Sequence, residues 1–286
     1  MNYKIYNKNL KNIAIIGLGK VGLPLSVCYA SKGFKVIGVD INKKRIQNLQ
    51  GGKFILHEPK FSTLFQKYQN RITFSTDLEY AIKISSSIFI IVPTPSQKNG
   101  NYSLKHILEV CKRISNILRN ESEWKLITVI STGIPGSMEN KIKPALENGS
   151  HKKAGVEFGL CYSPEFVALG NIIDNFFHPD FILIGQSDKK SGKILASIKM
   201  QVCDNIPPVY ITNFVNAELA KIGSNTFITT KISFANMLAR ICEKIPGANV
   251  DSITSILSAD SSIGGKRLFG SIGYSGPCYP RDNIAL

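Results

Sequence analysis

The sequence predicts an α/β protein: an N-terminal Rossmann-like, doubly wound parallel sheet, followed by a long central helix and a small helical region. Three observations support this fold class. Short apolar runs alternate with helix-length segments, the glycine-rich loop Gly17–Gly22 joins the first run to the first such segment, and the stretch Asn213–Lys244 has no proline and only one glycine. An alternation of this kind is typical of a parallel sheet whose strands are linked by helices.

The predicted strands are short runs rich in Ile, Val and Leu. Most are nearly continuous in apolar residues, which is typical of strands buried on both faces of a parallel sheet. The predicted strands are Ile13–Ile16, Lys35–Val39, Ile72–Phe74, Ile88–Val92, Leu126–Ile130 and Phe181–Ile184. The helices predicted between them include Pro24–Ser31, Lys43–Gln50, Ser103–Arg119 and Ser137–Leu146.

The pattern changes after residue 208. A short strand, Val209–Thr212, leads into the long helix Asn213–Lys244, and a second helix follows at Val250–Ala259. A glycine-rich loop, Gly264–Gly276, precedes the end of the sequence. We therefore predict a Rossmann-like domain over residues 1–208 and a helical region over residues 209–286.

Composition narrows the class of protein. The chain has 286 residues and a formal net charge of +15, and its basic residues are dispersed rather than clustered, so we expect no nucleic-acid partner. No run approaches the ~18 apolar residues of a membrane span, and the polar N-terminus lacks the apolar core of a signal peptide. The six cysteines form no CxxC pair, which favours a reducing compartment. We expect a soluble cytoplasmic protein with no membrane association.

The loop Gly17-Leu18-Gly19-Lys20-Val21-Gly22 has the GxGxxG pattern of dinucleotide binding. Gly17 permits a tight turn, Gly19 lets the backbone approach a pyrophosphate, and Gly22 lets the helix pack closely on the strand. Lys20 and Val21 lie at the start of the predicted helix, where the free backbone N–H groups favour the binding of a phosphate. The loop therefore predicts a dinucleotide cofactor.

Asp40 ends the second predicted strand, 18 residues after Gly22. A carboxylate there accepts hydrogen bonds from the ribose hydroxyls of NAD, so we expect NAD rather than NADP. Arg45 is included among the cofactor-binding candidates, although the basic residues that follow Asp40 leave room for NADP.

Two further loops follow predicted strands at the same edge of the sheet. Thr94 lies in Pro93-Thr94-Pro95 and Thr132 in Ser131–Gly136. Ligands of open α/β sheets bind beyond the carboxyl ends of the strands, so we expect both hydroxyls to contact cofactor or substrate. The alternative is that they only cap helices.

Three polar residues further along are candidates for catalysis. Glu165 follows an apolar run. The alternative to a catalytic role is that Glu165 lies in the first turn of a helix, where a carboxylate is favoured. Lys221 and Asn225 lie four residues apart on the long helix and so share one face of it. A lysine on a mostly buried helix needs a partner or a role, unless it lies on a solvated stripe.

Cys278 is enclosed by glycines and prolines in Gly273–Asp282. Pro280 is expected to begin a helix, and a helix N-terminus makes a thiol a better nucleophile. Asp282, one turn further on, is near enough to handle a proton. The alternative is an inert structural cysteine.

Together these residues resemble the nucleotide-sugar dehydrogenases of the UDP-glucose/GDP-mannose dehydrogenase family, in order from Ile13 to Leu286. The matching motifs are Ile13–Leu25, Asp40, Val92–Pro95, Ser131-Thr132 with Pro135-Gly136, Ser163–Phe166, Ala217–Lys221 with Asn225, and Gly276–Asp282. The resemblance implies oxidation of a sugar C6 alcohol to a carboxylate with reduction of two NAD. It also implies a homodimer formed through the long helix 213–244.

The resemblance also implies a role for each candidate. A water held by Asp282, Lys221 and Thr132 removes the alcohol proton as hydride leaves to NAD. Cys278 then attacks the aldehyde to form a thiohemiacetal, and Lys221 and Asn225 donate to the oxyanion.

The second hydride transfer of that scheme leaves a thioester on the cysteine. Water hydrolyses the thioester, with Glu165 assisting proton transfer. A covalent thiol adduct is needed because it gives an aldehyde a route to lose hydride.

Departures from the family pattern concern the sugar. Leu169 stands where the family usually has a second Glu, and Ser262 stands where an Arg commonly reaches the neighbouring subunit's sugar. Family members continue into a C-terminal domain that binds the substrate nucleotide, and we expect this domain to be absent here. We therefore expect NAD binding with little or no turnover from these 286 residues.

The leading hypothesis is thus the catalytic half of a nucleotide-sugar 6-dehydrogenase, with UDP-glucose as the expected substrate. GDP-mannose and a UDP-N-acetylhexosamine are the alternative substrates. A second hypothesis, from a different class of protein, is that the chain is an inactive NAD-binding and dimerisation module. A third is a two-electron dehydrogenase of the 6-phosphogluconate or hydroxyacyl type, which would not need Cys278.

Overall fold

A computed structural model describes residues 11–97, 102–270, 272–276 and 278–286. The chain divides into two compact units. The first comprises Met1–Pro95 and Ser103–Glu218, and the second comprises Ser96–Tyr102 and Leu219–Leu286. Each unit is described separately below.

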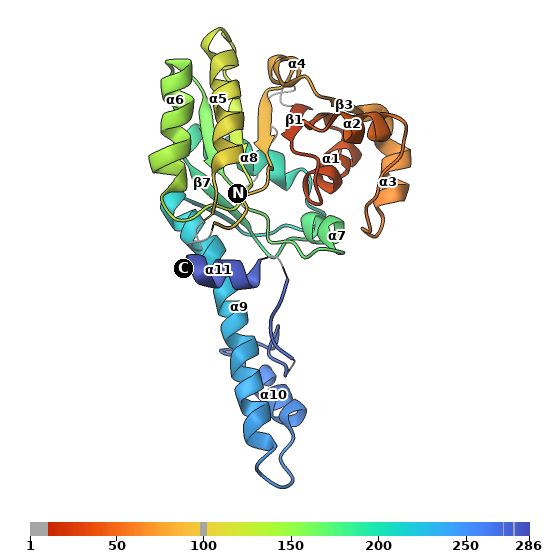
Figure 1. The fold of residues 1–286 in the computed structure, drawn as a ribbon, viewed down its shortest axis with the longest axis vertical. Coiled ribbons are helices and arrows are strands. Elements are labelled where there is room, and N and C mark those ends of the chain that lie inside the picture. The colour runs from red at the N-terminus through yellow and green to blue at the C-terminus, as the bar shows by residue number, and fades with distance from the viewer. Residues whose placement is uncertain (1–10, 98–101, 271, 277) are drawn as a thin grey trace. The chain divides into compact units, whose positions relative to one another are not determined.

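The first unit is built on one sheet of eight strands (Figure 1). Their order is β3-β2-β1-β4-β5-β6-β7-β8, so the chain reverses direction across the sheet between β1 and β4. The strands are β1 (Asn12–Ile16), β2 (Lys35–Val39), β3 (Ile72–Ser75), β4 (Ser87–Ile90), β5 (Leu126–Val129), β6 (Gly159–Tyr162), β7 (Ile182–Gln186) and β8 (Val209–Thr212). The predicted α/β class is confirmed.

One strand pair departs from the wholly parallel arrangement that the sequence predicts. β6 and β7 are antiparallel, with Cys161 opposite Gln186, whereas all other pairs are parallel. The connecting residues 163–181 bring the chain into β7 at the same edge of the sheet where β6 ends. No crossover is needed for an antiparallel neighbour, and this pair lies away from the β1–β4 reversal.

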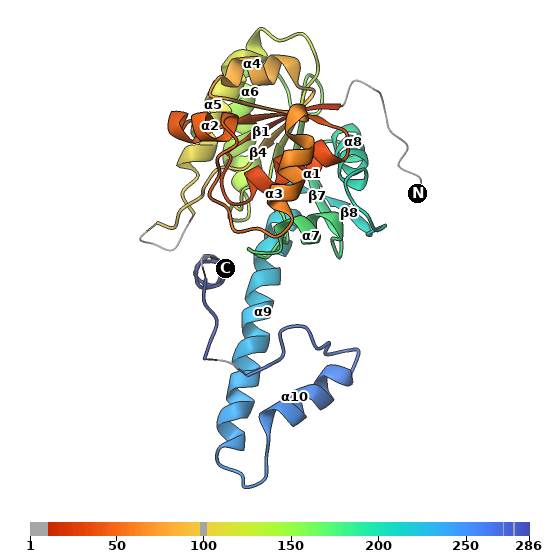
Figure 2. The same cartoon turned by 90° about the vertical axis from the view of Figure 1, so that its right-hand side faces the viewer.

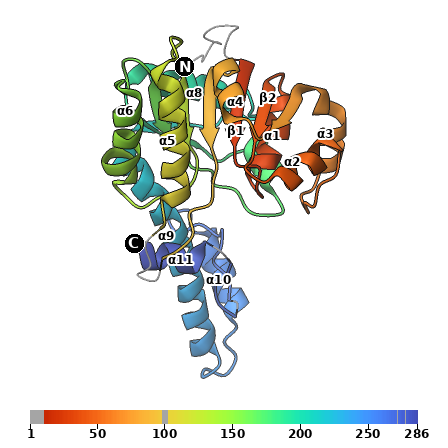
Figure 3. The same cartoon turned by 45° about the horizontal axis from the view of Figure 1, so that its top comes forward.

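Helices cover both faces because each buried strand points alternate side chains to opposite sides. Ile13 and Ile15 belong to one apolar core, whereas Ala14 and Ile16 belong to the other. The first core is covered by α1 (Gly22–Ser31), α2 (Lys43–Gln50), α3 (Phe61–Tyr68), α7 (Ile172–Phe177) and α8 (Lys189–Met200). The second is covered by α4 (Leu78–Ile84), α5 (Lys105–Arg119), the π-helical turn η3 (Met138–Ile142) and α6 (Lys143–Ser150); α5 and α6 lie side by side (Figure 3).

The second unit consists of most of α9 (Phe214–Cys242), α10 (Val250–Ala259) and α11 (Tyr279–Ala285). α10 starts near the end of α9 and slants away from it (Figure 2). α11 is joined to α9 by hydrogen bonds from Asn225 to Asp282 and between Thr229 and Asn283. The long helix is confirmed within two residues of its predicted ends. In the described part of the chain no helix is apolar enough over a sufficient length to cross a bilayer.

Candidate functional site

A cleft of about 620 Å³ opens in the first unit at the carboxyl ends of β1, β2 and β4. Its walls include three predicted cofactor-binding residues, Gly17, Asp40 and Arg45. The remaining lining residues are Ile16, Val39, Ile41, Asn42, Leu78, Val92, Pro93, His106, Glu109, Val110, Lys112 and Arg113. The cleft lies at the reversal of strand order, which is where open α/β sheets bind ligands.

The glycine-rich loop has the geometry that the sequence predicts. Gly17 has φ +102°, and a Cβ there would lie 2.2 Å from the Ile91 carbonyl oxygen. A Cβ on Gly22 would lie 1.9 Å from the Gly17 carbonyl oxygen. Gly19, by contrast, is exposed and has no atom within 4 Å of its Cβ position. The loop is therefore packed on its inner side and open on the side from which a phosphate would approach Lys20 and Val21.

Asp40 is buried at the end of β2 and is fixed by three donors. Its Oδ2 accepts from the Leu18 N–H at 3.0 Å and from Arg45 Nη1 at 2.8 Å. Its Oδ1 accepts from the Asn42 N–H at 2.9 Å. The structure thus joins the glycine loop, Asp40 and Arg45 into one rigid wall. A carboxylate with spare lone pairs at this place suits a ribose diol.

The loops that follow β4 and β5 are tied together. Ser131 Oγ donates to the Val92 carbonyl at 2.7 Å, and the Val92 N–H donates back to Ser131 Oγ at 2.9 Å. Thr132 is half-buried and directly follows Ser131. Thr94 is buried and lies two residues after Val92. The helix-cap alternative does not hold for Thr132, since the N-cap of the following helical turn is Ser137.

Glu165 follows β6, the neighbour of β5, at the same edge of the sheet. It lies in a loop, and its carboxylate accepts from Lys199 Nζ at 2.8 Å. The two side chains are 12% and 6% exposed. The neighbouring Ser163 Oγ donates to the Leu183 carbonyl, which fixes the loop on the sheet. Lys199 was not predicted, because no sequence pattern links the last turn of α8 to this loop.

In the second unit, Asp282 is the centre of a buried hydrogen-bonded group. Its Oδ2 accepts from Asn225 Nδ2 at 2.5 Å, and its Oδ1 accepts from the Tyr102 hydroxyl. The Arg281 guanidinium lies 4.4 Å from the centre of the Tyr102 ring. Burial and the hydrogen bond to Asp282 raise the pKa of Tyr102, so this hydroxyl stays a donor. The structure confirms that Asn225 and Asp282 come together and adds Tyr102, which the sequence did not indicate.

Cys278 is the exposed residue directly before α11, and its carbonyl accepts from the Asp282 N–H at 2.9 Å. Burial raises the pKa of Cys203 to about 11 and that of Cys111 to about 12. Those thiols therefore stay protonated at neutral pH. Lys221 is 9% exposed on α9, in agreement with the expectation of a buried lysine. Pro277 lies outside the described residues.

Glu218, a third residue that was not predicted as functional, is fully buried in the first unit. Its carboxylate accepts from the N–H groups of Gly136 at 2.7 Å and Met138 at 2.8 Å. Burial raises the pKa of Glu218, and the two N–H donors oppose that rise.

Comparisons with known proteins place these residues in a family. The family model described as UDP-glucose/GDP-mannose dehydrogenase family, NAD binding domain, matches residues 11–202, and the central domain model of the same family matches residues 215–286. The GDP-mannose 6-dehydrogenase of Pseudomonas syringae is 33% identical, over 96% of this chain and 63% of its own. The UDP-glucose 6-dehydrogenase of Rickettsia bellii is 34% identical, over 96% of this chain and 62% of its own.

Solved structures agree with this. A UDP-glucose dehydrogenase from Pyrobaculum islandicum has a TM-score of 0.88 and 28% identity, covering 96% of this chain and 62% of that one. A GDP-mannose dehydrogenase from Pseudomonas aeruginosa has a TM-score of 0.82 and 33% identity, covering 87% and 57%. The chain thus spans less than two thirds of the length of these relatives, and its cofactor is NAD. It belongs to the UDP-glucose/GDP-mannose dehydrogenase family.

Proposed function

We propose that this chain carries the catalytic residues for the four-electron oxidation of a nucleotide-sugar C6 alcohol to the uronate. The arrangement of the second unit supports this most directly. The thiol of Cys278 is exposed and lies four residues before Asp282. The Asp282 carboxylate accepts a hydrogen bond from the side-chain amide of Asn225. A two-electron dehydrogenase has no use for such a thiol, whereas oxidation of an aldehyde to an acid needs a covalent adduct.

In the first oxidation, a water held by Asp282 and Lys221 accepts the proton of the C6 hydroxyl. NAD, when bound, accepts one hydride in each of the two oxidations. The residues proposed to hold NAD are Gly17, Gly19, Lys20, Val21, Gly22, Asp40, Arg45, Thr94 and Thr132. The aldehyde that forms has the same carbon skeleton as the alcohol, because only a hydride and a proton have left the sugar.

In the second oxidation, the Cys278 sulfur forms a bond to the aldehyde carbon, and the thiol proton passes to the aldehyde oxygen to give a thiohemiacetal. Lys221 and Asn225 donate to the oxygen as it gains negative charge, which is the kind of fixed stabilisation that lowers such barriers. Loss of hydride from the carbon to NAD and of the hydroxyl proton to water leaves a thioester. Water then adds to the carbon and the carbon–sulfur bond breaks. One proton of the water restores the Cys278 thiol, Glu165 accepts the other, and the carboxylate leaves.

UDP-glucose is the substrate that we propose. One relative is a UDP-glucose 6-dehydrogenase, and another, matched over the same share of this chain, is a GDP-mannose 6-dehydrogenase. GDP-mannose is therefore the second candidate. The exposed Leu169 and the exposed Ser262 stand at the positions where the family pattern has charged residues. A reducing compartment such as the cytoplasm suits a reaction that needs Cys278 as a free thiol.

The test is a count of NADH per sugar with the chain in molar excess over limiting UDP-glucose, GDP-mannose or UDP-N-acetylmannosamine. Excess protein lets even slow turnover reach its end point. We expect two NADH and one uronate per UDP-glucose, measured by absorbance and mass spectrometry. Cys278→Ala should yield at most one NADH, whereas Cys242→Ala, at a half-buried cysteine of α9, should still yield two.

One NADH per sugar in the unaltered chain would contradict the proposal and favour a two-electron dehydrogenase. NAD binding without NADH from any sugar would favour the inactive module. In that case, Cys278 should also react with iodoacetamide no faster than Cys242.

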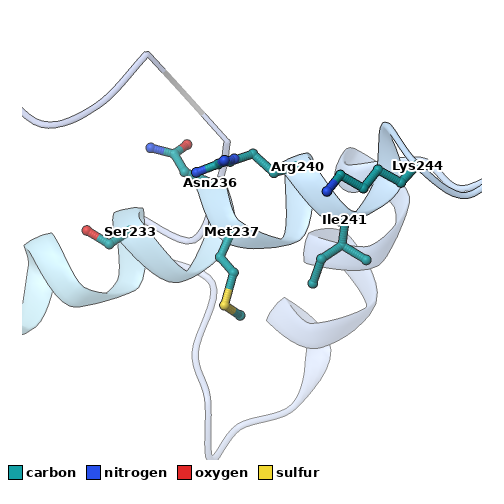
Figure 4. A pocket seen from close by; sticks show the side chains of 6 residues that line it. All are labelled: Ser233, Asn236, Met237, Arg240, Ile241 and Lys244. Atoms are coloured by element: carbon teal, nitrogen blue, oxygen red, sulfur yellow. The ribbon is translucent and has the colours of Figure 1, made fainter.

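We further propose that the chain forms a homodimer through α9. Exposed apolar side chains recur on this helix at Phe227, Phe234 and Ile241, a spacing of seven residues, and Met237 lies between the last two. Phe227 is 63% exposed. Met237 and Ile241 point to the same side of α9 in a groove of about 410 Å³ (Figure 4). A seven-residue apolar repeat is the pattern by which two helices pack along their length.

A further inference from the structure

Glu218 is fully buried, and its carboxylate accepts hydrogen bonds from a single loop. Its side chain is 0% exposed, and its two oxygens accept from the N–H groups of Gly136 and Met138 at 2.7 and 2.8 Å. These donors lie about eighty residues earlier in the chain. A buried carboxylate is costly unless its hydrogen bonds are well formed. The position is therefore specialised for holding this loop.

The loop in question, residues 131–137, connects β5 to the helical turn η3 and is anchored at both ends. At its start, Ser131 exchanges hydrogen bonds with Val92. At its end, the Ser137 N–H donates to the Ile134 carbonyl, and Gly136 adopts φ +88°. Glu218 binds this second end. Thr132 lies between the two anchors and is half-buried.

The place of the loop in the sheet decides which part of a dinucleotide it meets. β2, β1, β4 and β5 are successive neighbours, and all four run parallel. Asp40 at the end of β2 marks the adenosine side of the cleft, and the glycine loop after β1 marks the pyrophosphate. The remaining half of the dinucleotide must then extend toward the ends of β4 and β5.

A purely structural reading of Glu218 is that it caps the helical turn η3. An ordinary N-cap is a short side chain next to the helix it caps. Here the acceptor comes from a distant helix, and it binds the Gly136 N–H as well as that of Met138. It therefore fixes the shape of the loop and not only the start of a helix.

We propose that Glu218 is a positioning residue for cofactor binding: it holds loop 131–137 so that Thr132 meets the nicotinamide half of NAD. Glu218 itself does not touch the cofactor. The inference rests on the proposed role of Thr132 in NAD binding. Loss of the carboxylate should weaken interactions with the nicotinamide half and leave the adenosine half unaffected.

The experiment compares NAD with ADP-ribose, which lacks the nicotinamide, by isothermal titration calorimetry. In Glu218→Gln, which keeps size and shape but loses one acceptor, we expect the Kd for NAD to rise about tenfold. The Kd for ADP-ribose should change by less than about twofold. Glu139→Gln is the matched control, because Glu139 is exposed on the same helical turn, and both affinities should stay unchanged.

The outcomes separate the two hypotheses. If the unaltered chain binds ADP-ribose as tightly as NAD, the proposed contact of Thr132 with the nicotinamide half is wrong. If the unaltered chain prefers NAD but Glu218→Gln keeps that preference, the positioning role is overturned. An equal loss of both affinities would also overturn it, because it indicates general disorder.

A measurement on the unaltered chain does not depend on whether the variant folds. Hydrogen–deuterium exchange should slow in residues 131–138 on addition of NAD, and much less on addition of ADP-ribose. Equal protection by the two ligands would contradict the proposal.

Discussion

Asp282 shows how single residues build the second unit. Its two oxygens accept from side chains that come from distant parts of the chain, Asn225 on α9 and Tyr102 before α5. A carboxylate held by two such donors has one orientation, which a group that binds a water needs. Tyr102 therefore acts on the proposed chemistry through Asp282, and its hydroxyl must remain protonated to do so.

The pH dependence of stability tests the Tyr102 contact. Burial, with the hydrogen bond to Asp282, raises the pKa of Tyr102 above its ordinary value of about 10. A raised pKa in the folded state adds stability that is complete below pH 10 and is lost as the pH rises through the folded value. The free energy of unfolding of the unaltered chain should therefore exceed that of Tyr102→Phe at pH 8, with a gap that shrinks above pH 10.

Urea unfolding of both proteins at pH 8, 10 and 11 measures this gap. Burial also raises the pKa of Tyr29, but that residue is present in both proteins, so its effect cancels. A gap that stays constant, or widens, with rising pH would show that the Tyr102 hydroxyl does not donate to Asp282.

At the scale of elements, local signals explain what the sequence could predict. α10 has its predicted bounds because the Asn249 side chain accepts from the Ser252 N–H and so starts the helix. α2 starts in the same way, with Asn42 accepting from the Arg45 N–H. Such caps lie within three residues of the groups that they satisfy, and so a sequence pattern contains them.

Contacts between distant residues explain what the sequence could not predict. The hydrogen bonds from the Gly136 N–H to Glu218, from Lys199 to Glu165 and from Tyr102 to Asp282 join residues between 34 and 180 positions apart. No periodicity marks such partners. The direction of β7 was missed for a similar reason, since it depends on the path of the connection from β6 and not on the strand's own residues.

The apolar face of α9 carries a prediction of its own. If the chain dimerises through this helix, Phe234→Glu places a charge in the interface without a partner. Burying an unpaired charge is strongly unfavourable, so the dimer Kd should rise by about a hundredfold or more. Sedimentation velocity over a range of concentrations measures this change.

Ser255→Glu is the matched control, because it adds the same charge at an exposed position of α10. It should leave the dimer Kd close to that of the unaltered chain. A monomer at all concentrations in the unaltered chain, or equal effects of the two substitutions, would refute dimerisation through α9.

At the scale of the whole molecule, the division into two units has a consequence for unfolding. The proposed NAD-holding residues all belong to the first unit, whereas Lys221, Asn225, Cys278 and Asp282 belong to the second. A chain of two units need not unfold in one step. NAD should then stabilise the unit that binds it more than the other unit.

The only tryptophan, Trp124, belongs to the first unit, and the Lys190 ammonium lies 4.1 Å from the centre of its ring. Its fluorescence therefore reports on that unit alone. At NAD concentrations of about a hundred times the Kd, the free energy of unfolding seen by fluorescence should rise by about 2.7 kcal/mol. Far-UV circular dichroism, which also sees α9 and α10, should show a second transition that NAD leaves in place.

In Asp40→Ala, which removes the acceptor of the Leu18 and Arg45 donors, the shift at the same NAD concentration should be mostly lost. An undiminished shift in Asp40→Ala would place the ribose elsewhere. If the two transitions of the unaltered chain coincide and NAD moves them together, the chain unfolds as a single cooperative unit.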